Sequence, residues 1–134
     1  MSIYQYKAGL QNAASYQSSG SPFITGSTPL VGAQRVDFPN VTKNIQVWNL
    51  DAHATIDPPH HLYVYFHEDA PLDNKILVAA PTARGTGHVD LDVKCTHCFI
   101  SSSHVSGCDF RIYASLTGIE PKQMFELTGA GITK

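Results

Sequence analysis

The cysteine and histidine residues between positions 95 and 108 come nearest to a metal site in their spacing. Cys95, Cys98, His104 and Cys108 follow the order C-x2-C-x5-H-x3-C, and Zn²⁺ in structural sites takes four such ligands in a tetrahedron. Two other interpretations compete with zinc: a local disulfide, and free thiols that pack as small hydrophobic groups. Because Cys95 continues the apolar alternation of the residues before it, the sequence favours free thiols, with no metal and no other cofactor.

Histidine is frequent in the chain, and some of the histidines lie near carboxylates in the sequence. His60 and His61 precede the segment His67-Glu68-Asp69, so a metal site from His60, His61 and His67 is conceivable. Neighbouring side chains on a strand point to opposite faces, however, which makes joint ligation by His60 and His61 unfavourable. We expect polar histidines in turns and interfaces.

No other group of residues has the pattern of a catalytic site. The segment 85–88 is glycine-rich but lacks the Lys-Ser/Thr pair of a phosphate-binding loop. Residues 101–104 place serines beside a histidine without a nucleophile elbow. Asp90 and Asp92 share the solvent side of an expected strand, about 7 Å apart, a separation that could suit glycosidase chemistry, but such carboxylates mostly solubilise a strand. The sequence therefore predicts that the protein is not an enzyme.

Alternating apolar residues dominate the chain from Gln34 onward and indicate strands. Val89, Leu91 and Val93 alternate with charged residues. The run 62–67 is bulky on both faces, so we expect this strand in the middle of a sheet. The other expected strands cover 45–50, 76–80, 99–101 and 110–116, and turn-forming residues separate them.

These short strands predict an all-β fold, an antiparallel β-sandwich or jelly roll. An immunoglobulin-type order of strands stays open. One short helical turn is expected over residues 120–126, where Pro121 suits the first helical position.

Composition restricts the classes of partner. The 134 residues suffice for one core, and only 15% of them are charged where about 25% is usual. A net charge of −2 with scattered Lys and Arg argues against binding of nucleic acid.

No apolar stretch approaches the ~18 residues of a membrane helix, and no secretory signal is apparent. The odd number of cysteines fits synthesis in a reducing cytoplasm.

The first 33 residues differ from the rest, because they are rich in Ser, Gly and Gln and contain a single charge, Lys7. We predict an extended N-terminal arm over 1–33 and a β-sandwich domain over 34–134. A disordered tail is the alternative, but isolated aromatic residues favour an arm that docks on another subunit. The expected anchors at that interface are Tyr4, Tyr6, Tyr16 and Phe23.

Four segments carry a resemblance to a known group of proteins: residues 8–27, the motif DFPNVTK at 37–43, ASLTGI at 114–119 and LTGAGI at 127–132. They resemble short virion structural proteins of tailed phages, especially marine phages, over roughly a third of the chain. The resemblance implies a capsid decoration or cement protein that is made in the host cytoplasm and located in the virion. Its implied partners are the major capsid protein or other virion proteins, and a homo-oligomer, trimer or pentamer, is expected.

Two alternatives remain for the function. The protein could belong to another part of the virion: a vertex, neck, tail or fibre. It could also be a carbohydrate-binding β-sandwich module, with an aromatic platform on one sheet face formed by Trp48, Tyr63, Tyr65 and Tyr113.

Overall fold

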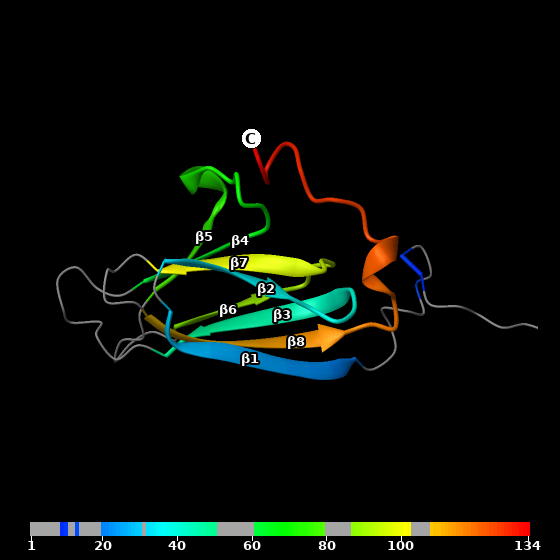
Figure 1. The fold of residues 1–134 in the computed structure, drawn as a ribbon, viewed down its shortest axis with the longest axis horizontal. Coiled ribbons are helices and arrows are strands. Elements are labelled where there is room, and N and C mark those ends of the chain that lie inside the picture. Colours follow the sequence, from blue (N-terminus) through cyan, green and yellow to red (C-terminus); the bar gives the residue numbers. More distant parts are fainter. Residues whose placement is uncertain are drawn as a thin grey trace, which may run out of the picture.

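The computed structural model describes residues 9–10, 13, 20–30, 32–50, 61–79, 87–102 and 108–134, with the backbone alone described at 27–30 and 108. In this part of the chain, eight strands form two four-stranded sheets, and two short 3-10 helices lie in the connections (Figure 1). The elements are β1 (Ser21–Leu30), β2 (Ala33–Asp37), β3 (Thr42–Asn49), β4 (Leu62–Tyr65), η1 (Leu72–Asn74), β5 (Ile76–Val78), β6 (His88–Leu91), β7 (His97–Ser102), β8 (Cys108–Leu116) and η2 (Pro121–Gln123).

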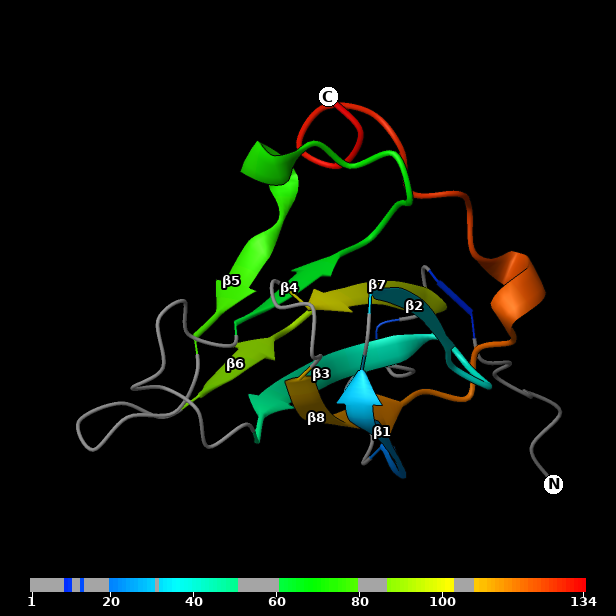
Figure 2. The same cartoon turned by 60° about the vertical axis from the view of Figure 1, so that its left-hand side comes forward.

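The strand order is that of a jelly roll. Sheet A has the order β1-β8-β3-β6 and sheet B the order β2-β7-β4-β5, with every paired strand antiparallel. The first strand pairs with the last, the second with the seventh, and so on inward, so that the pairs are β1–β8, β2–β7, β3–β6 and β4–β5. The pairs alternate between the two facing sheets (Figure 2). This connectivity defines a jelly roll. The prediction of an antiparallel all-β sandwich is confirmed.

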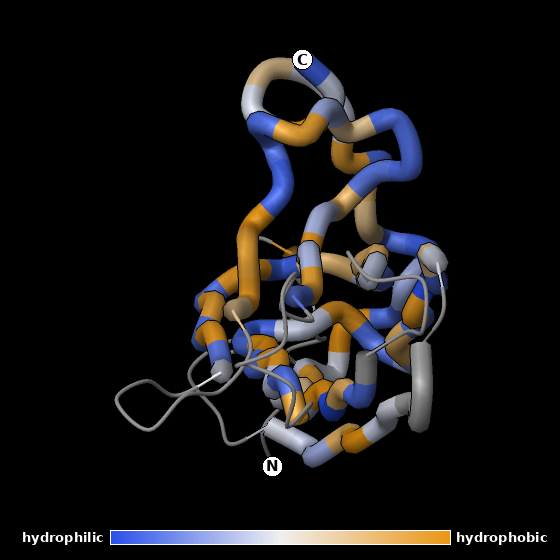
Figure 3. The backbone as a smooth tube through the Cα atoms, turned by 90° about the vertical axis from the view of Figure 1, so that its left-hand side faces the viewer, coloured by the Kyte–Doolittle hydropathy of each residue, from blue (hydrophilic) through white to orange (hydrophobic). Residues whose placement is uncertain are grey.

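The core lies between the two sheets. Alternating side chains of β3 and β8 meet those of β4 and β7, and the alternation of hydrophobic and hydrophilic residues along the strands is visible in Figure 3. Complete burial of each large apolar side chain contributes about 1.5–3 kcal/mol. The fully or almost fully buried members from these strands are Ile45, Val47, Leu62, Val64, Cys98, Ile100, Phe110, Ile112 and Ala114.

Several details of the predicted strands are confirmed. β4 lies inside sheet B between β7 and β5, as its bulky faces indicated. The helical turn expected at 120–126 is the 3-10 helix η2, with Pro121 at its start. Within the described residues, no helix has the length and apolar character needed to cross a bilayer.

The boundary of the predicted arm needs correction. Residues 21–30 were expected in an extended arm, whereas the structure pairs them with β8, with Phe23 opposite Ala114 and Thr25 opposite Ile112. Phe23 packs edge-to-face on Phe38 with 5.7 Å between ring centroids. The sequence did not reveal this strand because its inward positions are sparsely apolar, so that its pairing depends on β8 rather than on its own pattern.

Glycine makes the approach of β1 to β8 possible. A Cβ atom added at Gly26 would collide with the backbone oxygen of Phe110, and one added at Gly20 would collide with the Ser115 hydroxyl. Gly26 is therefore a site of close backbone contact, whereas Gly20 lies close to a side chain of β8.

Candidate functional site

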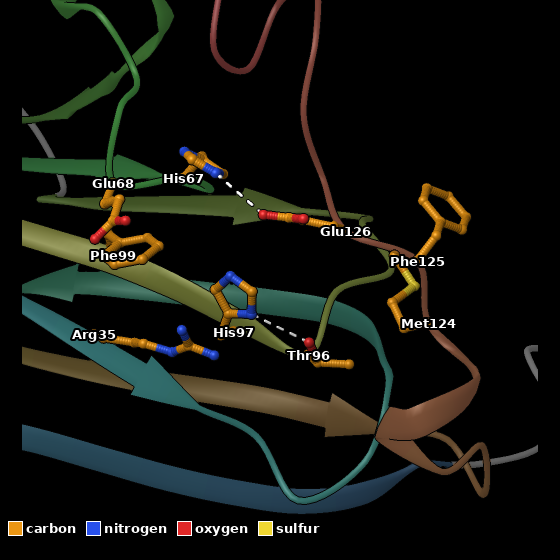
Figure 4. A pocket seen from close by; sticks show the side chains of 9 residues that line it. All are labelled: Arg35, His67, Glu68, Thr96, His97, Phe99, Met124, Phe125 and Glu126. Carbon is orange, nitrogen blue, oxygen red and sulfur yellow. Dashed lines mark hydrogen bonds and ion pairs between the residues drawn. The ribbon is translucent and has the colours of Figure 1, made fainter.

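A groove of about 520 Å³ lies between the outer face of sheet B and the C-terminal segment. We call residues 117–134 the C-terminal strap and this cavity the strap groove. Side chains from β2, the segment after β4, the start of β7 and the strap surround it (Figure 4). The lining residues are Arg35, His67, Glu68, Thr96, His97, Phe99, Met124, Phe125 and Glu126.

The strap is tied to the sandwich at both ends. Near its start, the Thr117 amide donates to the Val41 carbonyl at 2.8 Å, and the Val41 amide donates to the Ile119 carbonyl at 3.0 Å. Ile119 is fully buried. At the far end, the Asn74 side-chain amide donates to the Lys134 backbone oxygen at 2.6 Å. These contacts place the middle of the strap across the groove.

A ladder of side chains across sheet B fixes the floor of the groove. Tyr65 and Arg35 flank Phe99 in the register of the sheet. The Tyr65 and Phe99 rings are stacked with centroids 5.4 Å apart. Lys75 Nζ lies 4.3 Å from the Tyr65 centroid, and the Arg35 guanidinium carbon lies 6.0 Å from the Phe99 centroid. A cation therefore caps each end of an aromatic pair, and such cross-strand contacts hold side chains in register.

His97 stands beside this ladder, with its ring edge-to-face on Phe99 at 5.6 Å. Its Nδ1 lies 3.2 Å from the Thr96 hydroxyl oxygen. Burial, and next the positive charge of Arg35, lower the pKa of His97 from its usual value. A neutral imidazole follows at pH 7, which offers one nitrogen as a donor and one as an acceptor.

His67 links the segment after β4 to the strap. The Asp69 amide donates to His67 Nδ1 at 3.0 Å, so the neutral ring carries its proton on Nε2. This Nε2 lies 3.4 Å from Glu126 Oε1 (Figure 4). The His67 side chain is mostly buried, at 16% exposure, whereas Glu126 reaches solvent.

The charges around the groove are mixed. Arg35 donates through Nε to Asp37 at 2.8 Å, which leaves its terminal nitrogens for another acceptor. Glu68 and Glu126 supply carboxylates. Among the residues that the structure describes, no three His, Cys, Asp or Glu side chains are grouped to hold a metal ion. The groove can thus donate and accept hydrogen bonds next to apolar side chains.

The structure describes the side chains of two of the three cysteines in the zinc pattern, Cys95 and Cys98. Cys95 and Cys98 are free thiols, both fully buried in the core cluster. Burial raises the pKa of both thiols, and Cys95 Sγ lies 3.4 Å from the Thr42 hydroxyl oxygen. These two side chains pack as the hydrophobic interpretation predicted. His104 and the side chain of Cys108 lie outside the described residues.

The other candidate groups are not brought into the groove, apart from His67. Asp90 and Asp92 lie on the outer face of sheet A, where the Asn44 amide donates to Asp90 at 2.5 Å and to Asp92 at 2.8 Å. His60 lies outside the described residues.

The prediction that four aromatic residues form a platform on one sheet face is wrong, because they lie on two different sheets. Trp48 and Tyr113 belong to β3 and β8 of sheet A, whereas Tyr63 and Tyr65 belong to β4 of sheet B. Trp48 stacks on His88 with centroids 4.4 Å apart, and Tyr65 is only 5% exposed. Sequence alone could not reveal the split, because it depends on which sheet each strand joins.

A second surface is the open edge of β1. Among the described residues, this strand ends sheet A and pairs with β8 alone, and its sequence contains no charged residue. Ile24 is 63% exposed there, while the predicted anchor Phe23 faces its own domain. The sequence analysis missed Ile24, and its alternation with Phe23 was the available signal.

The other predicted arm anchors, Tyr4, Tyr6 and Tyr16, lie outside the described residues. Within the leader, Gly9 is described and lies beside η2, where an added Cβ would be 3.6 Å from Gln123 Oε1. This point of the leader is therefore close to its own domain.

The chain matches no protein-family model, no curated protein sequence and no solved structure. The strand order, the β1 edge and the strap groove are the observations from which a function can be argued.

Proposed function

We propose that the protein is a structural component of a phage virion, a capsid decoration protein that stabilises the shell by bridging neighbouring subunits. The jelly-roll strand order is the observation that carries this proposal. Among proteins, this double-sheet architecture is typical of viral capsid domains, lectins and cupins. The resemblance of the leader and closing segments to phage virion proteins points to the first of these classes.

The packing of the interior favours external contacts. The inward positions of both sheets are filled by apolar side chains such as Ile45, Ile100 and Ile112, so the described side chains between the sheets are not the polar ligands that a cupin metal site needs. A protein built in this way acts through its outer faces, edges and loops.

The β1 edge is suited to contact with another subunit. An edge strand has backbone donors and acceptors without partners on its open side, and most proteins guard such edges with charged side chains. β1 has no charge and exposes Ile24, so a strand of a neighbouring virion protein can add to sheet A there. Apolar burial contributes about 25 cal/mol per Å² before the cost of ordering, and many copies would multiply the gain.

Antibody labelling of purified particles tests the proposal. An antibody against the full chain should label phage particles at many repeated positions on the capsid in electron micrographs. Label confined to a vertex, neck, tail or fibre would move the protein to that part of the virion, and unlabelled particles would overturn the virion role.

Introducing a charge tests the β1 edge. Ile24→Lys should abolish oligomers or particle binding, measured by size-exclusion chromatography with light scattering and by sedimentation with capsids. Leu77→Lys is the matched control, because Leu77 is 51% exposed on β5, the edge strand of sheet B. Equal loss in both variants, or retention in both, would contradict a specific role for β1.

A further inference from the structure

We propose that the strap groove binds an uncharged saccharide. The groove lies on sheet B and the strap, whereas the β1 edge belongs to sheet A, so the two surfaces are separate. The proposal therefore does not depend on the virion role, and either one can fail without the other.

The hydrogen-bonding groups of the groove match those of a sugar. A sugar hydroxyl both donates and accepts, so its site needs both kinds of group close together. The terminal nitrogens of Arg35 donate, and the carboxylates of Glu68 and Glu126 accept, with Nε2 of His67 3.4 Å from Glu126 Oε1. His97, as a neutral ring, supplies either function.

The same groove has apolar surface for the C–H groups of a sugar ring. Tyr65 and Arg35 flank the Phe99 ring, so Phe99 offers its edge. Met124 and Phe125 of the strap also line the groove, although Figure 4 shows the Phe125 ring projecting away from His97 and Phe99. A mixture of a few fixed polar groups and apolar contacts is the usual composition of a small-molecule site.

The charges disfavour acidic ligands. Among the lining residues, Arg35 is the one Lys or Arg side chain, and it pairs with Asp37. Glu68 and Glu126 add two carboxylates, and His97 is neutral. A phosphate or an acidic sugar would meet more negative than positive charge. A purely apolar ligand would strip water from these polar groups without replacing their hydrogen bonds.

The polar groups are already positioned. Thr96 holds the His97 ring, the Asp69 amide fixes the tautomer of His67, and Asp37 orients Arg35. Side chains held in this way lose little entropy when a ligand binds. The volume of about 520 Å³ lies within the usual range of ligand sites.

A glycan array with the full chain, followed by titration calorimetry of the sugars that bind, tests the proposal. We expect binding of uncharged oligosaccharides and none of sialylated or sulfated ones. His97→Ala and Arg35→Met should each weaken binding about tenfold or more, the effect of losing a strong hydrogen bond. Trp48→Ala, on sheet A, should leave affinity unchanged.

Stability must be checked alongside affinity. Glu126→Gln changes a side chain that is 75% exposed, so this variant keeps the test valid if His97→Ala fails to fold. The proposal is overturned if no uncharged glycan binds at millimolar concentration, if acidic glycans alone bind, or if binding survives the groove substitutions or depends on Trp48.

Discussion

The β1 edge and the strap groove are two surfaces of one sandwich that are built in opposite ways. β1 offers backbone groups and an exposed Ile24 in a strand without charge. The groove offers imidazole, guanidinium and carboxylate groups, several of them fixed by a partner. The first surface suits a neighbouring polypeptide, which needs backbone pairing. The second suits a small ligand, which needs directed hydrogen bonds.

The two surfaces also gain their rigidity from different sources. β1 is held by close backbone approach to β8, which requires Gly26. The groove floor is held by the ladder from Lys75 through Tyr65 and Phe99 to Arg35. A side chain added at the close backbone contact should therefore destabilise the fold. The loss of one side chain from the ladder on the surface should cost less stability.

The largest effect is expected in the core that both surfaces share. Ile112 is fully buried in β8, and Ile112→Ala should lower the free energy of unfolding by about 2–5 kcal/mol. Urea unfolding followed by the fluorescence of the single Trp48 and by circular dichroism measures it. The two probes should give one transition. Separate transitions would mean that the edge and the groove do not depend on one cooperative core. Leu77→Ala, at an exposed position, is the control and should change little.

A smaller loss is expected at the edge itself. Gly26→Ala should lower stability by about 1–3 kcal/mol, the usual cost of overpacking, because the new methyl group meets the Phe110 carbonyl. In Gly20→Ala the new methyl group meets mainly a serine hydroxyl that can rotate, and Ser115→Ala should partly rescue it. If Gly26→Ala is as stable as the native chain in urea unfolding, the close approach of β1 to β8 is refuted.

The groove should add a modest dependence of stability on pH. Because the pKa of His97 is lowered in the folded protein, the unfolded chain takes up a proton first as pH falls through about 6.5. The free energy of unfolding should therefore decrease between pH 7.5 and 5.5. The comparison of the native chain with His97→Gln isolates this contribution from that of Arg35, Asp37, His67 and Glu126, which all act on the pKa of His97. Identical pH profiles would contradict it.

The smallest effect is expected for the contact between His67 Nε2 and Glu126 Oε1, which links the strap to the segment after β4. Glu126→Gln should change the free energy of unfolding at pH 7 by about 0.5 kcal/mol or less, because exposed pairs are weak. Thermal unfolding measures the difference. A loss comparable to that of Gly26→Ala would show that the strap, like β1, is essential to the fold.

Much of the interior was readable from the sequence. The alternation in 110–116 predicted which side chains are buried, and the bulk of both faces of 62–67 placed β4 inside a sheet. These inferences succeed because a period of two residues is imposed by the strand itself. The free thiol of Cys95 also packs in the core as its alternation predicted, whereas Cys98, which a straight strand would place on the opposite face, is buried in the same core.

The candidate site could not be predicted from the sequence in the same way. Arg35, Phe99 and Glu126 are far apart in the chain, and no local pattern marks them as neighbours. His67 was singled out, but for a metal site with His60 and His61. The split of Trp48 and Tyr113 from Tyr63 and Tyr65 follows from the order of strands, which local patterns do not encode.

The sequence by itself determined that the chain is a single all-β sandwich with an apolar interior and few charges, because side-chain alternation and composition act locally. Tertiary structure alone decided that residues 21–30 join sheet A and that a strap closes a groove over sheet B. Both depend on contacts between residues about 60 to 95 positions apart, whose pairing emerges only when the whole chain folds into two layers.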